Sequence, residues 1–180
     1  MTGGILGMQI QWLVLGLFAL NMLICWLTLL SKKFQWYQFI AGLIFIVLPL
    51  LTVFTDQPRF ELDFYWWNIA GFVAIALGLV VSLWARVEFI KAGVKLEVLP
   101  DKLITSGPYQ FVRHPQFLGL VFIWVGWWWV WSAVYAFYFG MFILALTWLE
   151  ALLEEKLVFE KQFGQQYRDY KAQTGMFWIK

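Results

Sequence analysis

The chain has a single histidine, His114, which stands beside Arg113 in a polar, turn-forming segment between strongly apolar runs, residues 103–119. Pro115 follows directly, and proline is favoured in the first turn of a helix. We therefore expect Arg113 and His114 at a helix N-terminus, where unpaired N–H groups and the helix dipole favour an anionic ligand. The alternative is that Arg113 reaches lipid phosphates while His114 only caps the helix.

Three carboxylates form a second group of residues that could take part in catalysis or binding. Glu150 and Glu154 are four residues apart, so they share one face of a helix, and Glu155 lies beside them. Carboxylates at membrane depth are costly and usually face the protein interior or a water-filled site. The alternative is that these side chains have simply reached the membrane surface. On the residues alone, both interpretations stay open.

Two other classes of site are not expected. The one histidine and the one cysteine, Cys25, lie far apart in the sequence and do not form a metal-ligand set. Cys25 lies in an apolar run, and we interpret it as a small buried hydrophobic residue. The net charge of +2 is too small to indicate binding to nucleic acid.

The elements that must position these residues are membrane-spanning helices. Hydrophobic residues make up 62% of the chain and charged residues 13%, whereas soluble domains are about half apolar. Several apolar stretches approach the roughly 20 residues that a helix needs to cross a bilayer. We predict an all-α integral membrane protein with a single domain, 1–180, in which 1–90 holds three spans and 91–180 the candidate site. The five predicted spans are residues 10–30, 36–54, 66–85, 117–131 and 133–153.

Almost nothing separates the last two predicted spans, so they must form an antiparallel helical hairpin. Residues 154–171 then change to a highly charged, amphipathic pattern, and we expect one terminal helix there. Its apolar side is formed by Leu157, Val158, Phe163 and Tyr167.

The distribution of lysine and arginine predicts the orientation. With five spans and the N-terminus outside, every basic cluster lies on one side, and the other side carries only Arg59. We predict that the basic side is cytoplasmic. The four tryptophans in residues 127–131 then fall at the opposite interface, as is typical of an anchoring belt; an aromatic cofactor box is the alternative. We expect no cleavable signal, since the first run is long enough to span and lacks a basic start. The lack of targeting signals favours a prokaryotic cytoplasmic membrane.

Two sequence blocks occur in order around the predicted hairpin: GPYQFVRHPQFLG at residues 107–119 and EEKLVFEKQFGQQYRDY at residues 154–170. They resemble the isoprenylcysteine carboxyl methyltransferase family of integral membrane enzymes. The family pattern is a GPY turn, RHP-x-aromatic-x-G, a helical hairpin, a glutamate pair and FG-x-x-Y-x-x-Y. Each part has a counterpart here, over roughly the last 80 residues of the chain.

This resemblance implies a methyltransferase that uses S-adenosylmethionine, bound on the cytoplasmic face beneath the C-terminal helix. It also implies a lipophilic or prenylated acceptor taken from the bilayer. Methyl transfer from a sulfonium to an anionic acceptor removes two opposite charges, which a dry pocket favours. By the family pattern, with the charge of Arg113 added, the cofactor is held by Asp101, Lys102, Leu103, Ile104, Tyr109, Arg113, His114, Pro115, Gln116 and Phe117.

The chain departs from the family pattern in three places. Phe117 stands where tyrosine is common, and the glutamate doublet comes one residue early. The family also has an arginine shortly after the second tyrosine, assigned to the substrate carboxylate, and here Gln173 stands near that place. Glutamine cannot grip a carboxylate bidentately. Arg168 is a possible replacement, or else a solvated surface arginine.

These departures leave the acceptor open between a carboxylate, a thiol and a lipid amine. We expect low activity on prenylcysteine and a preference for a smaller or neutral acceptor. Two further interpretations remain beside the methyltransferase: an NADPH-dependent reductase of the sterol-reductase type, and a non-enzymatic membrane protein of the same fold. The candidate catalytic residues are Glu150, Glu154, Glu155, Arg168 and Gln173.

Overall fold

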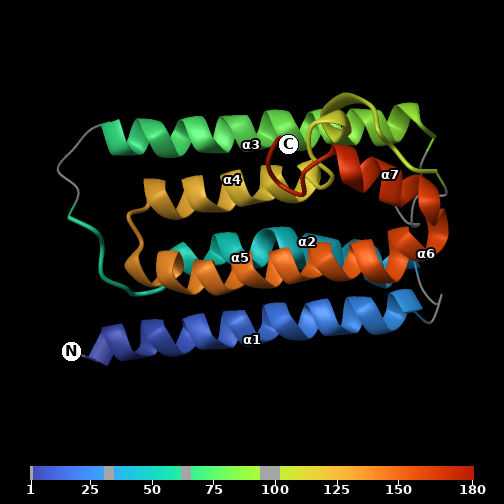
Figure 1. Ribbon diagram of the computed structural model, residues 1–180. Helices are drawn as coiled ribbons and strands as arrows, with labels where there is room; N and C mark the ends of the chain where they lie inside the picture. Colours follow the sequence, from blue (N-terminus) through green and yellow to red (C-terminus); the bar gives the residue numbers. More distant parts are fainter. Residues whose placement is uncertain (1, 31–34, 62–65, 94–101) are drawn as a thin grey trace.

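The computed structural model describes residues 2–30, 35–61, 66–93 and 102–180. Five long helices of mainly apolar sequence lie side by side (Figure 1), and this confirms the predicted all-helical fold class. Two short helices, α6 and α7, lie at one end of this bundle. The long helices are α1 (Thr2–Leu30), α2 (Gln35–Leu51), α3 (Trp66–Lys91), α4 (Pro115–Val130) and α5 (Val134–Glu154).

Within the described residues, three helical stretches are long and apolar enough to cross a membrane: Ile5–Leu27, Trp66–Lys91 and Val134–Phe163. Two shorter apolar helices, Ile40–Phe54 and Pro115–Val130, lie beside them. At about 1.5 Å per residue, the shorter helices extend roughly 24 Å, less than the hydrocarbon thickness of about 30 Å. The three long apolar stretches indicate that the chain is an integral membrane protein. The number of five spans stays a prediction, because the two shorter helices are not long enough to decide it.

Glycines bring α3 and α4 into backbone contact. Gly71 and Gly78 on α3 face Gly119 and Gly126 on α4, and the two glycines on each helix are seven positions apart. A Cβ atom on Gly78 would lie 2.5 Å from the carbonyl oxygen of Gly119, and one on Gly126 would lie 2.6 Å from that of Gly71. Small residues allow membrane helices to approach this closely. The contact holds α4, which begins directly after His114, against α3.

The tryptophans of α4 pack inward rather than at the membrane surface. Trp127 and Trp128 each donate their indole N–H, at 3.0 Å, to backbone oxygens of Leu50 and Pro49 in the last turn of α2. Carbonyl groups in a last helical turn lack partners within the helix, so these bonds satisfy them. Trp128 is only 1% exposed. The predicted anchoring belt is therefore wrong for these two residues, because their polar N–H groups face α2 and not lipid headgroups.

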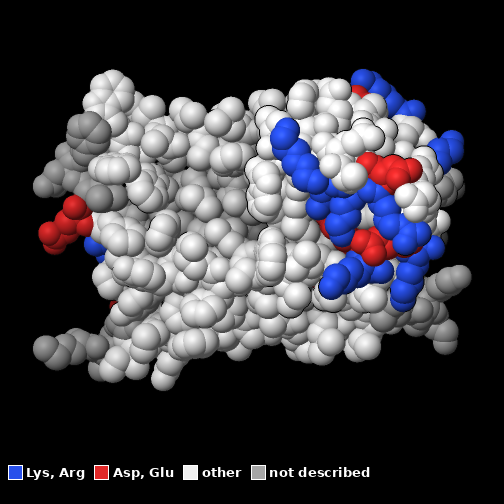
Figure 2. Space-filling model, in the orientation of Figure 1, with Lys and Arg blue, Asp and Glu red and all other residues white. Residues whose placement is uncertain are grey.

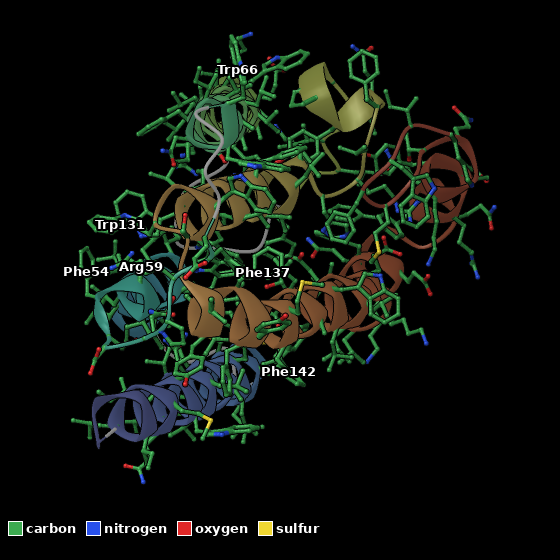
Figure 3. All side chains as sticks on the ribbon, turned by 90° about the vertical axis from the view of Figure 1, so that its left-hand side faces the viewer. Phe54, Arg59, Trp66, Trp131, Phe137 and Phe142 are labelled. Carbon is green, nitrogen blue, oxygen red and sulfur yellow. The ribbon has the colours of Figure 1, made fainter. Side chains whose placement is uncertain are left out.

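The turn between α4 and α5 is closed by the loop that follows α2 and the short 3₁₀-helix η1 (Thr52–Phe54). The guanidinium of Arg59 lies 5.4 Å from the ring centre of Trp131 and donates a hydrogen bond to the carbonyl oxygen of that residue. The backbone N–H of Phe60 donates to the oxygen of Ser132 at 2.8 Å. Figure 3 shows Phe54, Arg59 and Trp131 grouped at this end. The tight helical hairpin that the sequence predicted is confirmed.

The C-terminal part is not one amphipathic helix, and that expectation is wrong. A π-helical turn, η3 (Glu155–Phe159), follows α5 and leads into α6 (Glu160–Phe163). The chain then breaks at Gly164, with φ 54° and ψ −121°, a conformation open essentially to glycine alone. The second helix, α7 (Gln165–Gln173), follows the break. Figure 2 shows lysine and arginine side chains gathered at this end of the molecule.

Candidate active site

The site begins at the 3₁₀-turn η2 (Gly107–Gln110), which is held against α3. The Ser106 hydroxyl donates to Glu88 at 2.8 Å, and the ammonium of Lys91 lies 2.9 Å from the other oxygen of that carboxylate. Gly107 has a φ of 59°, and a Cβ atom there would lie 2.5 Å from the Glu88 side chain. Glycine is therefore required both by conformation and by space. The turn places Tyr109 inside the protein, where it is buried.

His114 directly precedes α4, but its side chain does not cap the helix. The ring lies between two carboxylates: Nε2 is 3.2 Å from Oε1 of Glu155, and Nδ1 is 3.5 Å from Oε2 of Glu154. The side chain of Phe117 stacks on the imidazole, with ring centres 5.7 Å apart. Burial by itself lowers the pKa of His114, but its hydrogen bonds to the two carboxylates and their charges outweigh burial, so the pKa is raised above its usual value.

Glu155 is the centre of a buried charge network. Its side chain is 1% exposed, and three basic groups surround it. The Nε of Arg113 lies 2.7 Å from one oxygen, which His114 also approaches, and the Nζ of Lys171 lies 2.9 Å from the other. The charge of Arg113, which we expected to face an anionic ligand or lipid phosphates, is thus paired with a carboxylate of the protein itself.

The tail after α7, residues 174–180, packs against the polar segment 103–119, which we call the motif segment. The sequence analysis missed this contact. The backbone N–H groups of Arg113 and His114 donate to the carbonyl oxygens of Gly175 and Met176, at 2.9 and 3.2 Å. The phenol of Tyr170 donates to the carbonyl oxygen of Tyr109 at 2.5 Å. These contacts join residues about 60 positions apart, for which a single sequence offers no periodic signal.

A small cavity, which we call the motif cavity, lies between the motif segment and the C-terminal helices. Its volume is about 30 Å³, room for one or two water molecules. Five predicted cofactor residues line it, and the sequence analysis missed its aromatic walls. Asp101, also predicted, lies outside the described residues. The lining consists of Phe89, Lys102, Leu103, Ile104, Tyr109, Arg113, Phe159, Phe163, Tyr167 and Tyr170.

A larger cavity of about 290 Å³, the membrane cavity, lies among α1, α2, α4 and α5. Glu150 and Glu154 both line it, and Glu150 accepts a hydrogen bond from the indole N–H of Trp26 at 2.5 Å. The two glutamates that were expected to share a helix face thus both line the membrane cavity. The rest of the lining is Met22, Cys25, Trp26, Ala41, Gly42, Phe45, Ile46, Phe117 and Leu120.

His114 lines neither cavity but lies close to residues of both. Its ring contacts Phe117, which lines the membrane cavity, and lies 6.3 Å from the ring of Phe159, which lines the motif cavity. Glu154 reaches the imidazole from the membrane cavity, and Arg113 precedes it on the motif side.

Besides His114 and Glu155, four predicted site residues within the described part of the chain line neither cavity. Pro115 is buried as the first residue of α4, and Gln116 is half-buried beside it. Arg168 and Gln173 lie on α7, where both are exposed. Their predicted roles stay predictions.

The bundle of apolar helices with a charged site at one end defines an integral membrane protein. A family model described as phospholipid methyltransferase matches residues 66–166, more than half of the chain. The chain therefore belongs to the phospholipid methyltransferase family, and it is a membrane methyltransferase. It matches no curated protein and no solved structure. The membrane-methyltransferase part of the sequence resemblance is thus confirmed, while the match names phospholipid rather than prenylcysteine methylation.

Proposed function

We propose that this protein transfers a methyl group from S-adenosylmethionine to the amino group of a membrane lipid. The observation that carries the proposal is the pair of carboxylates, Glu150 and Glu154, in the otherwise apolar membrane cavity. Two carboxylates attract an ammonium headgroup and repel a carboxylate such as that of prenylcysteine. The family match to phospholipid methyltransferases supports the same choice.

The walls of the membrane cavity suit a cationic headgroup as well. Trp26, Phe45 and Phe117 contribute aromatic rings beside the two carboxylates. Cations bind favourably over aromatic faces, and a desolvated contact of this kind contributes about 2 kcal/mol. A volume of about 290 Å³ is near the lower end for small-molecule pockets, as expected for a headgroup whose acyl chains remain outside.

The motif cavity has side chains that fit S-adenosylmethionine, which when bound supplies a methyl group on a positively charged sulfur. Lys102 offers a cation for a carboxylate, and aromatic rings offer apolar faces for an adenine. The present volume of about 30 Å³ is too small for such a ligand. We therefore propose that α6 and α7 move outward during binding, with Gly164 between them as the hinge.

We also propose that the site faces the cytoplasm. Lysine and arginine gather at the end that holds the motif cavity (Figure 2), and cytoplasmic segments of membrane proteins carry an excess of these residues. A water-soluble methyl donor would reach the motif cavity from that side. The lipid acceptor would reach the membrane cavity from within the bilayer.

The test uses the purified protein in lipid nanodiscs with methyl-labelled S-adenosylmethionine. Three acceptors are compared: phosphatidylethanolamine, a prenylcysteine analogue and a long-chain thiol. We expect label in the lipid amine and little in the prenylcysteine ester. Label in the ester alone overturns the proposed acceptor. Binding of NADPH without binding of S-adenosylhomocysteine overturns the proposed donor and favours the reductase interpretation.

A further inference from the structure

An amine acceptor must lose a proton before it can be methylated, because an ammonium nitrogen has no lone pair. A primary ammonium has a pKa of about 10, so near neutral pH almost all of the acceptor is protonated. The carboxylates of the membrane cavity favour the ammonium form further. An enzyme that binds this form therefore needs a proton acceptor within reach of the headgroup.

We propose that Glu154 and His114 together accept this proton, and that Glu155 positions the imidazole. The inference rests on the proposed lipid-amine acceptor. Glu154 lines the membrane cavity, where its side chain is 28% exposed, and its Oε2 lies 3.5 Å from Nδ1 of His114. The imidazole lies deeper, 5% exposed, and connects Glu154 to the buried carboxylate of Glu155. A proton accepted by Glu154 can thus pass on to Nδ1 of His114.

Glu155 does not itself take the proton. Arg113 lies 2.7 Å from Oε1 and Lys171 2.9 Å from Oε2, so two cations keep this carboxylate ionised. An ionised carboxylate at 3.2 Å from Nε2 orients the ring of His114 and stabilises its protonated form.

The groups that face His114 come from every element packed against it. Glu154 comes from the end of α5 and Glu155 from η3, while Lys171 of α7 acts through Glu155. Arg113 precedes the histidine in the chain, and the tail contributes the uncharged ring of Phe177, with ring centres 5.9 Å apart. Glu150 has a different task, since its carboxylate accepts the hydrogen bond of Trp26 and faces the headgroup.

The step balances as follows for one methylation. The ammonium N–H bond breaks, its electron pair stays on nitrogen, and the proton passes to the Glu154–His114 pair. The nitrogen lone pair then forms the bond to the methyl carbon, and the electrons of the methyl–sulfur bond stay on the departing sulfur. The pair returns its proton to water when the products leave.

The first test compares the pH dependence of kcat/KM for the native protein and for Glu154→Gln. With the pair intact, the rate levels off at a pH below the pKa of the lipid amine, because the pair takes the proton from the bound ammonium. Without the carboxylate, only the free amine reacts, and the rate rises about tenfold per pH unit toward the pKa of the lipid amine. Glu154→Asp keeps a carboxylate and the native profile, and Glu61→Gln, exposed at the opposite end, is the matched control.

The second test needs no activity. Because His114 is the only histidine, isotope-labelled histidine has one imidazole signal in an NMR titration of the protein without ligand. We expect Glu154→Gln to lower the pKa of His114 and Glu61→Gln to leave it unchanged. An unchanged pKa in Glu154→Gln overturns the pairing.

The outcomes separate the two proposals. A native protein that methylates no lipid amine overturns the proposed function and this inference with it. A native protein that is active, with a Glu154→Gln profile parallel to its own, overturns the inference alone, because a structural defect lowers the rate equally at every pH. If Glu154→Gln does not fold, His114→Asn is used for the same comparison of profiles.

Discussion

At the scale of single residues, the carboxylate of Glu155 compensates three buried or half-buried basic groups at once. Arg113, His114 and Lys171 all approach it within 3.2 Å. Such a network stabilises the fold only while it is complete, because a buried charge without its partner is strongly unfavourable. The first prediction follows from this arrangement.

We expect Glu155→Gln to destabilise the protein by about 3–5 kcal/mol, because it leaves buried cations without a counter-charge. Thermal unfolding in one detergent measures the effect. The matched control is Glu160→Gln, since Glu160 also pairs with Lys171 but its side chain is 36% exposed. An exposed pair of this kind contributes about 0–1 kcal/mol. Equal, small losses in both variants would contradict the network.

The second residue-scale prediction concerns Glu150. Its replacement by glutamine keeps a carbonyl oxygen for the hydrogen bond from Trp26 but removes the charge that attracts an ammonium. A bond to a charged group contributes about 1.5–3 kcal/mol, so KM for the lipid amine should rise roughly tenfold or more. Affinity for S-adenosylhomocysteine, measured by calorimetry, should stay unchanged, since Glu150 does not line the motif cavity. Loss of that affinity would contradict the division between the two cavities.

At the scale of elements, the position of α4, which follows His114 of the candidate site, depends on glycine contacts with α3. Gly78→Ala would place a methyl group 2.5 Å from the carbonyl oxygen of Gly119. We expect the helices to separate, at a cost of about 1–3 kcal/mol and with lower activity. Gly16→Ala in α1 is the control, because nothing lies within 4 Å of its added Cβ atom. Thermal unfolding of both variants tests this; similar effects would exclude the close contact.

The turn η3 accounts for a departure noted in the sequence. The glutamate doublet comes one residue earlier than the family pattern predicts, counted back from Phe163 and Gly164. A π-helical turn bonds residue i to i+5 and so holds one residue more than an α-helical turn. Because η3 lies between the doublet and Gly164, it absorbs this offset while Glu155 remains inside the protein.

At the scale of the whole molecule, charge is divided unequally between the two ends. The fourth prediction is that the end with α6 and α7 is cytoplasmic, since basic residues gather there (Figure 2). In a Cys25→Ser background, Gln165→Cys should resist a membrane-impermeant thiol reagent in intact cells. Glu61→Cys, at the opposite end, should react with it. The reverse pattern of labelling would invert the orientation.

The sequence by itself determined the membrane class, the helical hairpin and the segment of the candidate site. These features depend on local properties: the length of an apolar run, a turn at Gly107 and a proline after His114. The break at Gly164 was also visible as a glycine inside a helical pattern, although we expected an unbroken helix. Local signals of this kind are sufficient where the bilayer itself requires a helix.

Only the tertiary structure decided which groups meet. Trp26 and Glu150 are 124 positions apart and Arg113 and Glu155 are 42 apart, yet each pair shares a hydrogen bond. The hydrogen bond from Trp128 to Pro49 and the one from Arg113 to Gly175 also join residues far apart in the sequence. Polarity and periodicity describe one helix at a time, whereas these contacts depend on how helices pack against each other. The pairing of a buried charge, and with it the chemistry available at His114, is therefore a property of the assembled fold.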